Sequence, residues 1–438
     1  MPAYFFLYER GPRPVKSSFV GVAMKTIITA LKKLSKTSLL FRWITRTILY
    51  VIRSIGYLYY YLTGKTRPQL IIFEAYMGRS FSCSPKALYL AMLEDSAYDT
   101  FEFVWVFRNP ENYEFLKQNK NTRLVRYLSG EYFKLYSRAK YWFSNSRIPE
   151  QIRPRKDQVY LQTWHGTPLK KLGYDITQEG GNAMNNLGEI RKKNDKDVRR
   201  YSYMLSPSEF CTEKFKSAFN IKGLGREDII IQAGYPRNDF LFKYTENDIK
   251  RVRKALDLPL DKKVILYAPT WRDNQHEVGQ GYTYSVGMDF DRLQRELGDE
   301  YIILFRAHYF VTNSFDFAAH PGFVVNVSEY DDINELYIIS DMLITDYSSV
   351  FFDYANLKRP ILFYMYDLDF YQNNLHDFYI GLDDLPGDII QTEQELIAAI
   401  HSLDTSTYYN SKYQNFNHRF NYLDGPDSGK RIVKGIIK

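Results

Sequence analysis

The sequence predicts an α/β protein made of two parallel-sheet domains, and three observations support this fold class. The chain has 438 residues, which is long for one hydrophobic core but suits two domains of about 150–200 residues. Strand-like apolar runs alternate with helix-like stretches along most of the chain, as in parallel sheets covered by helices. Residues 343–364 have the pattern of a strand, a short helix and a second strand, which is the βαβ unit of a parallel sheet.

An N-terminal segment precedes the domains and carries the positive charge of the chain. Between Met24 and Phe73 there are nine basic residues and no acidic one, whereas the whole chain has a formal net charge of +7. At a helical rotation of about 100° per residue, several basic residues share one side of a helix and aliphatic residues share the other. No uncharged run reaches the roughly 18 residues that a membrane-spanning helix needs. We therefore expect a basic amphipathic helical segment over residues 1–66.

The predicted partner of this segment is a membrane surface. Basic residues combined with Trp43 and a cluster of tyrosines are typical of a segment in an anionic membrane interface, and we predict this for residues 24–62. A helical hairpin packed on its own domain is the alternative. No nucleic acid partner is expected, because the aromatic residues are not interleaved as a stacking platform. Residues 1–23 lack the features of a signal peptide, so we expect a peripheral protein on the cytoplasmic face of the membrane.

The first α/β domain is predicted over residues 67–243, after a linker that contains Gly64 and Pro68. Its strands are expected near residues 70–76, 101–107, 139–144, 159–164, 202–206 and 229–233, with helices near 85–94 and 209–219. The polar and charged run 178–200 predicts a mobile loop.

The second domain is predicted over residues 244–438 and begins with a helix near 246–256. Its strands are expected near residues 264–268, 301–305, 323–327, 342–345 and 361–365. A second mobile loop is expected at 272–286.

Composition agrees with an ordinary globular protein. Hydrophobic residues make up 45% of the chain and charged residues 25%. Cys83 and Cys211 are the only cysteines, which excludes a disulfide framework and indicates a reducing compartment. No cysteine and histidine cluster has the spacing of metal ligands, so we expect no metal site.

Histidines follow two of the predicted strands. His165 comes at the end of the strand near 159–164, where Gly166 and a nearby proline force a turn, and Arg306 and His308 follow the strand near 301–305. In open α/β sheets, ligands bind beyond the carboxyl ends of the strands. These side chains are therefore candidate catalytic and binding residues, with a purely structural role as the alternative for each.

A third strand end carries two serines. After the strand that ends at Thr345, the sequence continues with Asp346, Tyr347, Ser348 and Ser349 and then a predicted helix. The unpaired N–H groups of a helix N-terminus, together with the helix dipole, form an anion site. Ser348 and Ser349 are thus candidate phosphate-binding residues, whereas Asp346 is interpreted first as a helix cap.

Six motifs resemble those of the CDP-glycerol glycerophosphotransferases of teichoic acid synthesis. They lie at residues 165–170 (HGTPLK), 205–208 (LSPS), 234–239 (GYPRND), 267–272 (YAPTWR), 306–308 (RAH) and 345–349 (TDYSS), in the order of the family. The resemblance covers roughly residues 70–370. One position departs from it, because the family often has proline where this chain has Tyr309. The resemblance implies a GT-B architecture, in which two Rossmann-like domains face each other across a cleft and the stretch 405–438 crosses back to the first domain.

The resemblance also implies a reaction. Glycerol phosphate would pass from CDP-glycerol to a hydroxyl of a lipid-linked, polyprenyl-diphosphate-bound saccharide, with release of CMP and without an obligatory metal or other cofactor. The first domain would bind the acceptor and the second the CDP donor. A histidine suits the role of general base because its unperturbed pKa lies near 6.5, and we assign this role to His165.

The remaining candidate residues are assigned around this reaction. The donor phosphates are expected to contact Thr270, Arg272, Arg306, Thr345, Asp346, Ser348 and Ser349. His308 is expected to neutralise charge on the leaving group, with proton donation as its alternative. Gly166, Arg237, Asn238 and Asp239 are expected to line the cleft, although Asn238 and Asp239 also suit an ordinary turn and cap.

Several alternatives stay open at the level of sequence. CDP-ribitol is the nearest alternative donor, because the motifs carry the phosphate chemistry and not the length of the polyol. A GT-B glycosyltransferase or epimerase acting on a nucleotide sugar is a second alternative, and a non-catalytic membrane-bound binding protein is a third. The sequence leaves open a homo-oligomer and the choice between primer addition and polymerisation.

Overall fold

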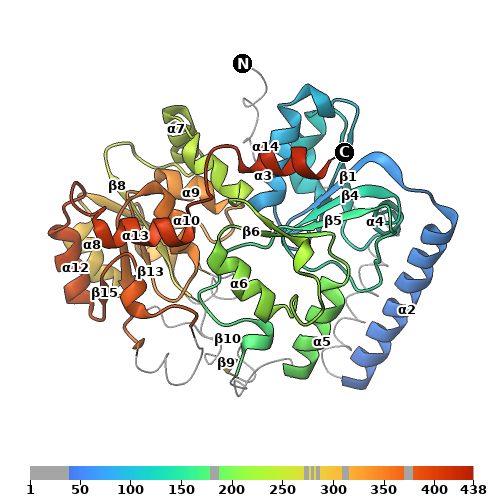
Figure 1. The fold of residues 1–438 in the computed structure, drawn as a ribbon. Helices are drawn as coiled ribbons and strands as arrows, with labels where there is room; N and C mark the ends of the chain where they lie inside the picture. Colours follow the sequence, from blue (N-terminus) through green and yellow to red (C-terminus); the bar gives the residue numbers. More distant parts are fainter. Residues whose placement is uncertain are drawn as a thin grey trace.

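The computed structural model describes residues 39–177, 187–270, 276–277, 281–282, 287–307, 315–368 and 378–437. Of these, the side chains of 39–42, 276–277 and 281–282 are left out of the description. Within these residues the chain forms two parallel sheets with helices packed on them (Figure 1). The predicted fold class of two Rossmann-like domains is therefore confirmed. The predictions for residues 1–38, for Arg272 and for His308 fall outside the described residues.

The first sheet has seven parallel strands in the order β3-β2-β1-β4-β5-β6-β7. They are β1 (Arg67–Glu74), β2 (Glu102–Phe107), β3 (Thr122–Arg126), β4 (Ala139–Ser144), β5 (Val159–Gln162), β6 (Tyr203–Ser206) and β7 (Ile230–Gln232). Alternate residues of β1 enter two cores: Ile71 and Phe73 pack with α3 (Cys83–Leu93), and Leu70 and Ile72 with α4 (Gly130–Tyr136) and α6 (Glu209–Ala218). Burial on both faces explains the apolar run Leu70–Phe73 of this central strand.

The second sheet has six parallel strands in the order β12-β11-β8-β13-β14-β15. They are β8 (Lys263–Ala268), β11 (Tyr301–Phe305), β12 (Val324–Asn326), β13 (Met342–Thr345), β14 (Ile361–Tyr364) and β15 (Ile389–Ile390). One face packs against α8 (Phe290–Leu297) and α12 (Glu393–His401). The other packs against α9 (Ile333–Ile339), α10 (Val350–Tyr354) and α13 (Ser411–Phe420).

Both sheets follow the same strand order, which locates their ligand-binding edges. In each sheet the order reverses beside the first strand, between β1 and β4 in one and between β8 and β13 in the other. The crevice beyond the carboxyl ends of the strands at such a switch point is where doubly wound sheets bind ligands. The two crevices therefore lie after Glu74 and Ser144 in the first sheet and after Ala268 and Thr345 in the second.

The described residues bear on parts of two loop predictions, whereas residues 178–186, 272–275, 278–280 and 283–286 lie outside them. The prediction of a loop over 178–200 is wrong from residue 187 onward, where α5 (Leu187–Val198) is a helix. Its buried residues include the polar Asn194, which donates from Nδ2 to Ala218 O (3.2 Å), so the helix has little apolar periodicity to detect. Within the predicted loop 272–286, a short antiparallel pair forms between β9 (His276–Glu277) and β10 (Gly281–Tyr282).

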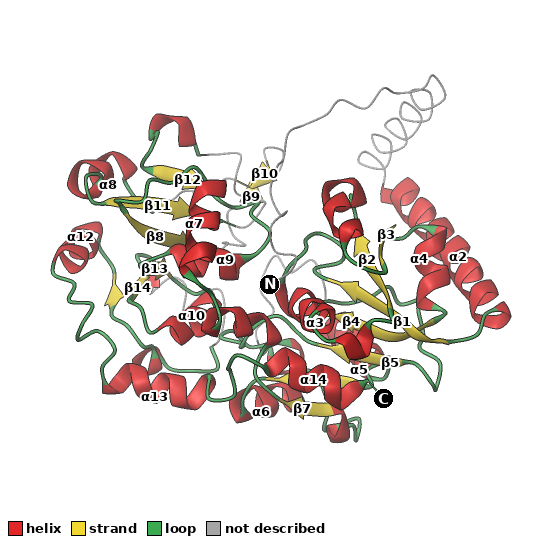
Figure 2. Cartoon of the chain, turned by 90° about the horizontal axis from the view of Figure 1, so that it is seen from above, coloured by secondary structure: helices red, strands yellow, loops and turns green. Residues whose placement is uncertain are grey.

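The C-terminal region crosses back to the first domain, as the resemblance implied. After α13, helix α14 (Ser428–Ile436) packs on α3 and contributes Ile432, Val433 and Ile436 to the core of the first sheet. Figures 1 and 2 both place α14 beside α3. The chain thus passes between the two domains twice, before α7 (Glu246–Ala255) and again after α13.

Helix α2 (Leu39–Thr63) lies at the outer edge of the first domain beside α4 (Figure 2). Its inner side is held by Tyr57, whose hydroxyl donates to Arg153 O, and by the Arg155 guanidinium 4.1 Å from the Tyr61 ring. Its outer side exposes a stripe of large apolar residues: Ile44, Ile48, Val51, Ile55, Leu58 and Leu62. No helix in the described part of the chain is long and apolar enough to cross a membrane.

Candidate active site

His165 lies beyond the end of β5, at the carboxyl edge of the first sheet. Its Nδ1 lies 2.8 Å from Asn145 O, the residue that follows β4. A carbonyl oxygen can only accept, so Nδ1 carries the proton and Nε2 carries the lone pair. The ring stacks on Trp164 (4.3 Å between centroids) and meets the edge of Tyr76 (5.8 Å). These contacts fix both the orientation of the imidazole and the nitrogen that can accept a proton.

The surroundings of His165 keep its ring neutral. Burial lowers the pKa of His165 to about 4, and the positive charge of Arg237 acts in the same direction. The hydrogen bond to Asn145 O opposes both by favouring the protonated ring. At neutral pH the imidazole is therefore in the form that a general base requires.

The backbone around His165 is strained. Trp164 has φ +54°, and Tyr76 and Met77 in the loop after β1 have φ +48° and +57°. The loop is anchored to the segment after β4, because Tyr76 N donates to Asn145 Oδ1 (2.8 Å) and Met77 N donates to Ser146 Oγ (3.0 Å). Left-handed backbone at non-glycine residues costs about 1–3 kcal/mol each and concentrates at functional sites.

The predicted phosphate-binding serines lie at the corresponding edge of the second sheet. Ser348 and Ser349 are half-buried, and in the described part of the chain neither hydroxyl forms a hydrogen bond. They precede α10, a helix of five residues whose N-cap is Ser349. Two unengaged hydroxyls at a strand end are available to a ligand.

Thr345 and Asp346 lie behind these serines. Thr345 is fully buried and its hydroxyl donates to Ala268 O (2.8 Å), so it joins β13 to β8. Asp346 Oδ1 accepts from Thr270 N (2.7 Å) and Tyr347 N (2.6 Å). The first interpretation of Asp346 as the cap of the following helix is therefore wrong; its carboxylate holds the turn at Thr270 against the turn at Ser348.

Arg306 follows β11, and its side chain is held by hydrogen bonds to backbone oxygens alone. Its Nη1 donates to Val327 O (3.0 Å) and Tyr330 O (2.8 Å). Burial lowers the pKa of Arg306, while the nearby Tyr337 and Tyr76 and the more weakly acting carboxylates of Asp332 and Asp331 oppose this shift. Among the described residues no carboxylate forms an ion pair with this guanidinium. A charged group kept without a counter-ion suits an anionic ligand.

The two strand-end turns lie beside each other across the domain interface. A methyl group on Gly166 would lie 3.4 Å from Ser349 Oγ and 3.6 Å from Arg237 Nη2. Both are ordinary contact distances for a methyl group, so the turn at His165 lies close to the turn at Ser349. The turns of His165 and of the two serines, which are about 180 positions apart in the sequence, are thus brought together.

The other predicted cleft residues are buried in the interface rather than exposed in an open cleft. Arg237 and Asn238 lie on the turn η5 (Pro236–Phe242) and are 7% and 1% exposed. Asp239 accepts from Ser428 N (3.1 Å) and Gly429 N (2.8 Å), so it caps the start of α14. The turn-and-cap alternative describes the contacts of Asp239.

Three neighbours of the site are absent from the sequence predictions. Tyr76 and Asn145 follow β1 and β4, and a search of every strand end for polar or aromatic residues would have found them. Asp353 lies within the helix after Ser349, where a buried carboxylate has no sequence signal. In the described residues no group of three or more His, Cys, Asp or Glu side chains is arranged to hold a metal ion.

Comparison with known proteins points to one family. The sequence pattern of the CDP-glycerol:poly(glycerophosphate) glycerophosphotransferases matches residues 58–438. A teichoic acid poly(glycerol phosphate) polymerase of Bacillus spizizenii is 39% identical over 375 residues, which are 84% of this chain and 92% of that protein. A teichoic acid glycerol-phosphate transferase of Staphylococcus aureus is 40% identical over 377 residues, 84% of this chain and 93% of its own.

Solved structures and further relatives point to the same family. A structure of the wall teichoic acid polymerase TagF, a variant with CDPG, has a TM-score of 0.79 and 36% identity and covers 90% of this chain and 96% of that chain. The chain spans about half the length (52% and 48%) of two longer poly(glycerol phosphate) polymerases, of Staphylococcus epidermidis and Bacillus subtilis. Relatives named as ribitol-phosphate polymerases are more distant, at 29–33% identity.

Proposed function

This chain belongs to the CDP-glycerol:poly(glycerophosphate) glycerophosphotransferase family, and we propose that it transfers glycerol phosphate from CDP-glycerol to a hydroxyl of a lipid-linked teichoic acid precursor, releasing CMP. The acceptor in this proposal is a polyprenyl-diphosphate-linked saccharide or a chain growing on it. CDP-glycerol is favoured over CDP-ribitol because the glycerol-phosphate relatives are nearer in sequence.

One observation carries the proposal. The turn that carries the neutral imidazole of His165 and the turn that carries the unengaged hydroxyls of Ser348 and Ser349 come from different domains and lie beside each other at Gly166 and Ser349. A base beside an anion-binding group is what the transfer of a phosphoryl group to an alcohol requires.

The geometry supports a direct displacement. The acceptor hydroxyl attacks the phosphorus distal to cytidine, and its proton passes to His165 Nε2. The bond between that phosphorus and the bridging oxygen breaks, and CMP leaves with the electron pair. In this mechanism Arg306, Ser348 and Ser349 neutralise charge on the diphosphate, and Thr270 is held beside them by Asp346. Arg272 and His308 join them in the proposal, on the family resemblance.

The test of the reaction is CMP release by purified protein with a lipid-linked acceptor. CDP-glycerol, CDP-ribitol and a UDP-sugar are compared as donors, without added metal and with chelator. CMP from CDP-glycerol alone supports the proposal. CMP from CDP-ribitol alone would change the donor, and UDP from the sugar nucleotide would replace the reaction class.

The serines are expected to hold the donor. The double variant Ser348→Ala with Ser349→Ala removes two hydroxyls without disturbing any protein hydrogen bond of the described chain. We expect it to raise the dissociation constant for CDP-glycerol by roughly tenfold or more, because each lost hydrogen bond to a charged phosphate is worth about 1.5 kcal/mol or more. Calorimetry measures the affinity, and Ser402→Ala, on the exposed end of the second domain, is the control. Unchanged affinity would remove these serines from the phosphate site.

We further propose that the protein lies on the cytoplasmic face of the bacterial membrane as a peripheral protein. The outward apolar stripe of α2 supports this, since a helix that served only to cover its own domain would turn its apolar side inward. Basic residues at 24–62 would add attraction to anionic lipids.

The stripe can be tested by substitution. Ile48→Glu with Ile55→Glu places two charges on the outer side of α2, where these residues are 52% and 64% exposed. We expect the variant to lose pelleting with anionic liposomes while its fold stays intact, because both side chains are more than half exposed. Leu260→Glu, 70% exposed in the second domain, should pellet like the unaltered protein. Pelleting of the double variant at the unaltered level would count against this membrane surface.

A further inference from the structure

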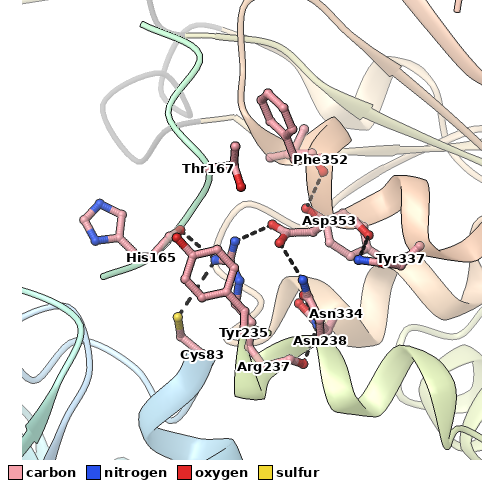
Figure 3. Close-up of polar contacts among 12 residues, drawn as sticks. Cys83, His165, Thr167, Tyr235, Arg237, Asn238, Asn334, Tyr337, Phe352 and Asp353 are labelled. Carbon is pink, nitrogen blue, oxygen red and sulfur yellow. Dashed lines mark hydrogen bonds and ion pairs between the residues drawn. The ribbon is translucent and has the colours of Figure 1, made fainter. Parts of the chain in front are cut away.

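A buried polar network joins the two domains directly beneath His165 (Figure 3). At its centre is the guanidinium of Arg237, which belongs to the first domain. Its Nη1 donates to the backbone oxygen of His165 (2.6 Å), and its Nη2 forms an ion pair with Asp353. Asp353 lies on α10 of the second domain, four residues after Ser349. One side chain therefore contacts both the residue that carries the base and the helix that follows the serines.

The surrounding contacts leave this guanidinium little freedom. Asn238 Nδ2 donates to the second oxygen of Asp353 (2.9 Å), so the carboxylate is held from two positions of the same turn. Asn334 Nδ2, on α9, donates to the backbone oxygen of Arg237 (2.6 Å). The Tyr235 ring lies 4.9 Å from the guanidinium carbon. Both the backbone and the side chain of Arg237 are thereby fixed relative to the second domain.

A gain in folding stability does not by itself explain the buried ion pair between Arg237 and Asp353. A buried ion pair often stabilises a fold no better than apolar residues of similar size, and its best-attested use is to fix the register of the elements that it joins. Arginine suits such a role because its planar fork donates in two fixed directions at once. Here the two directions are the backbone of His165 and the helix of the serines.

We propose that Arg237 is a positioning residue for the transfer reaction: by holding His165 O and Asp353 together it sets the distance between the base in the first domain and the donor phosphates at Ser348 and Ser349. This inference rests on the proposed function. Arg237 touches neither substrate and acts through the two groups that it joins. Its charge also lies close enough to His165 to disfavour protonation of the ring.

The first test compares Arg237→Lys with Arg200→Lys. Arg200 is also buried and ion-paired, but its partner is Asp197 and its other contacts are carbonyl oxygens in the first domain. Lysine keeps the charge and loses the fork in both variants. We expect Arg237→Lys to lower kcat for CMP release by about 10–100-fold, with KM for CDP-glycerol changed less than about threefold, because misplacement by about 1 Å has this effect on rate. Arg200→Lys should keep kcat within about twofold.

The second test follows the His165 ring by NMR and does not depend on turnover. In Arg237→Gln the imidazole signal, assigned with a His165→Asn variant, should titrate at a higher pH than in the unaltered protein, because a nearby positive charge is gone. Arg237→Lys should leave the titration close to its original position. Asp353→Asn, which keeps the size of the side chain, replaces Arg237→Lys if the latter does not fold, and should lower kcat likewise.

The outcomes separate this inference from the proposed function. A kcat for Arg237→Lys equal to that of Arg200→Lys, or an Arg237→Gln variant with an unshifted His165 titration, would overturn the positioning role. No CMP release by the unaltered protein, together with a shifted titration in Arg237→Gln, would refute the proposed reaction and retain the link between Arg237 and His165.

Discussion

His165→Ala should reduce CMP release by about 10²–10⁴-fold, the range typical for loss of a general base. The variant removes Nε2, the one nitrogen of the ring that the hydrogen bond to Asn145 O leaves free to accept a proton. Donor affinity should change little, since His165 faces the acceptor hydroxyl in the proposed mechanism. Stopped-time assays with saturating CDP-glycerol measure the loss, and His401→Ala, exposed on α12, is the matched control. Residual activity above one tenth would exclude His165 as the base.

The pH dependence provides a second signature of the same residue. The pKa of His165 is lowered to about 4, so the basic form is present above this pH and is lost as the pH falls through it. The acid limb of kcat/KM, which reports the free enzyme, should therefore lie near pH 4 rather than near 6.5. Bound diphosphate brings negative charge close to the ring and raises its pKa. The acid limb of kcat should accordingly lie at higher pH than that of kcat/KM.

Lys86→Met is expected to lower the free energy of unfolding by about 2–4 kcal/mol. Lys86 lies on α3, and its Nζ is 2.7 Å from Oδ2 of Asp332, the N-cap of α9. The same Nζ is 3.2 Å from Oε1 of Glu335, which lies within α9. All three side chains are less than one-sixth exposed, so removal of the ammonium group leaves two carboxylates that face one another with little solvent. Chemical denaturation measures the change. Lys117 forms an ion pair with Glu114 in which both side chains are about half exposed. Lys117→Met should therefore alter the free energy of unfolding by less than about 0.5 kcal/mol.

The stabilising effect of the Lys86–Glu335 ion pair should also be lost at acid pH. Burial raises the pKa of Glu335, but Lys86 and Arg251 outweigh burial and bring it down to about 2. A carboxyl with a lowered pKa stabilises the fold above its unfolded pKa of about 4.3 and loses this contribution as the pH falls towards 2. The difference in stability between the unaltered protein and Lys86→Met should therefore shrink between pH 4.5 and 2 (about the two pKa values). A difference that stays constant over this interval would contradict the assignment.

The strands could be predicted because their environment is uniform. Strands β8, β11 and β13, and the second half of β1, are buried on both faces, so their sequences contain apolar runs of three or more residues bounded by turns. Strand β3 escaped prediction because only Thr122 and Val125 among its five residues are buried. Helix α5 escaped because its inner side is polar and satisfied by hydrogen bonds, which a pattern of hydrophobicity cannot register.

The site could be predicted only where its residues follow strands directly. His165, Arg306 and Ser348 occupy strand ends, and topology brings strand ends to one edge. The contacts of Asp346 and Thr345 were not predictable, since a short polar side chain near a turn can bond to several backbone groups with similar ease. Arg237 and Asp353 pair across the domain interface, and a partner more than 100 positions away leaves no trace in a single sequence.

The second passage of the chain between the domains restricts how they can move. A protein whose lobes share one linker can twist as well as bend about it, whereas two separate linkers suppress torsion and leave opening about a single axis. Here the two passages lie side by side, because Ser428 N donates to Asp239 and Asn238 Nδ2 donates to Asp424 where the turn before α7 meets the segment before α14. In the proposed reaction, exchange of CMP for fresh CDP-glycerol would then require only one opening motion of one domain relative to the other.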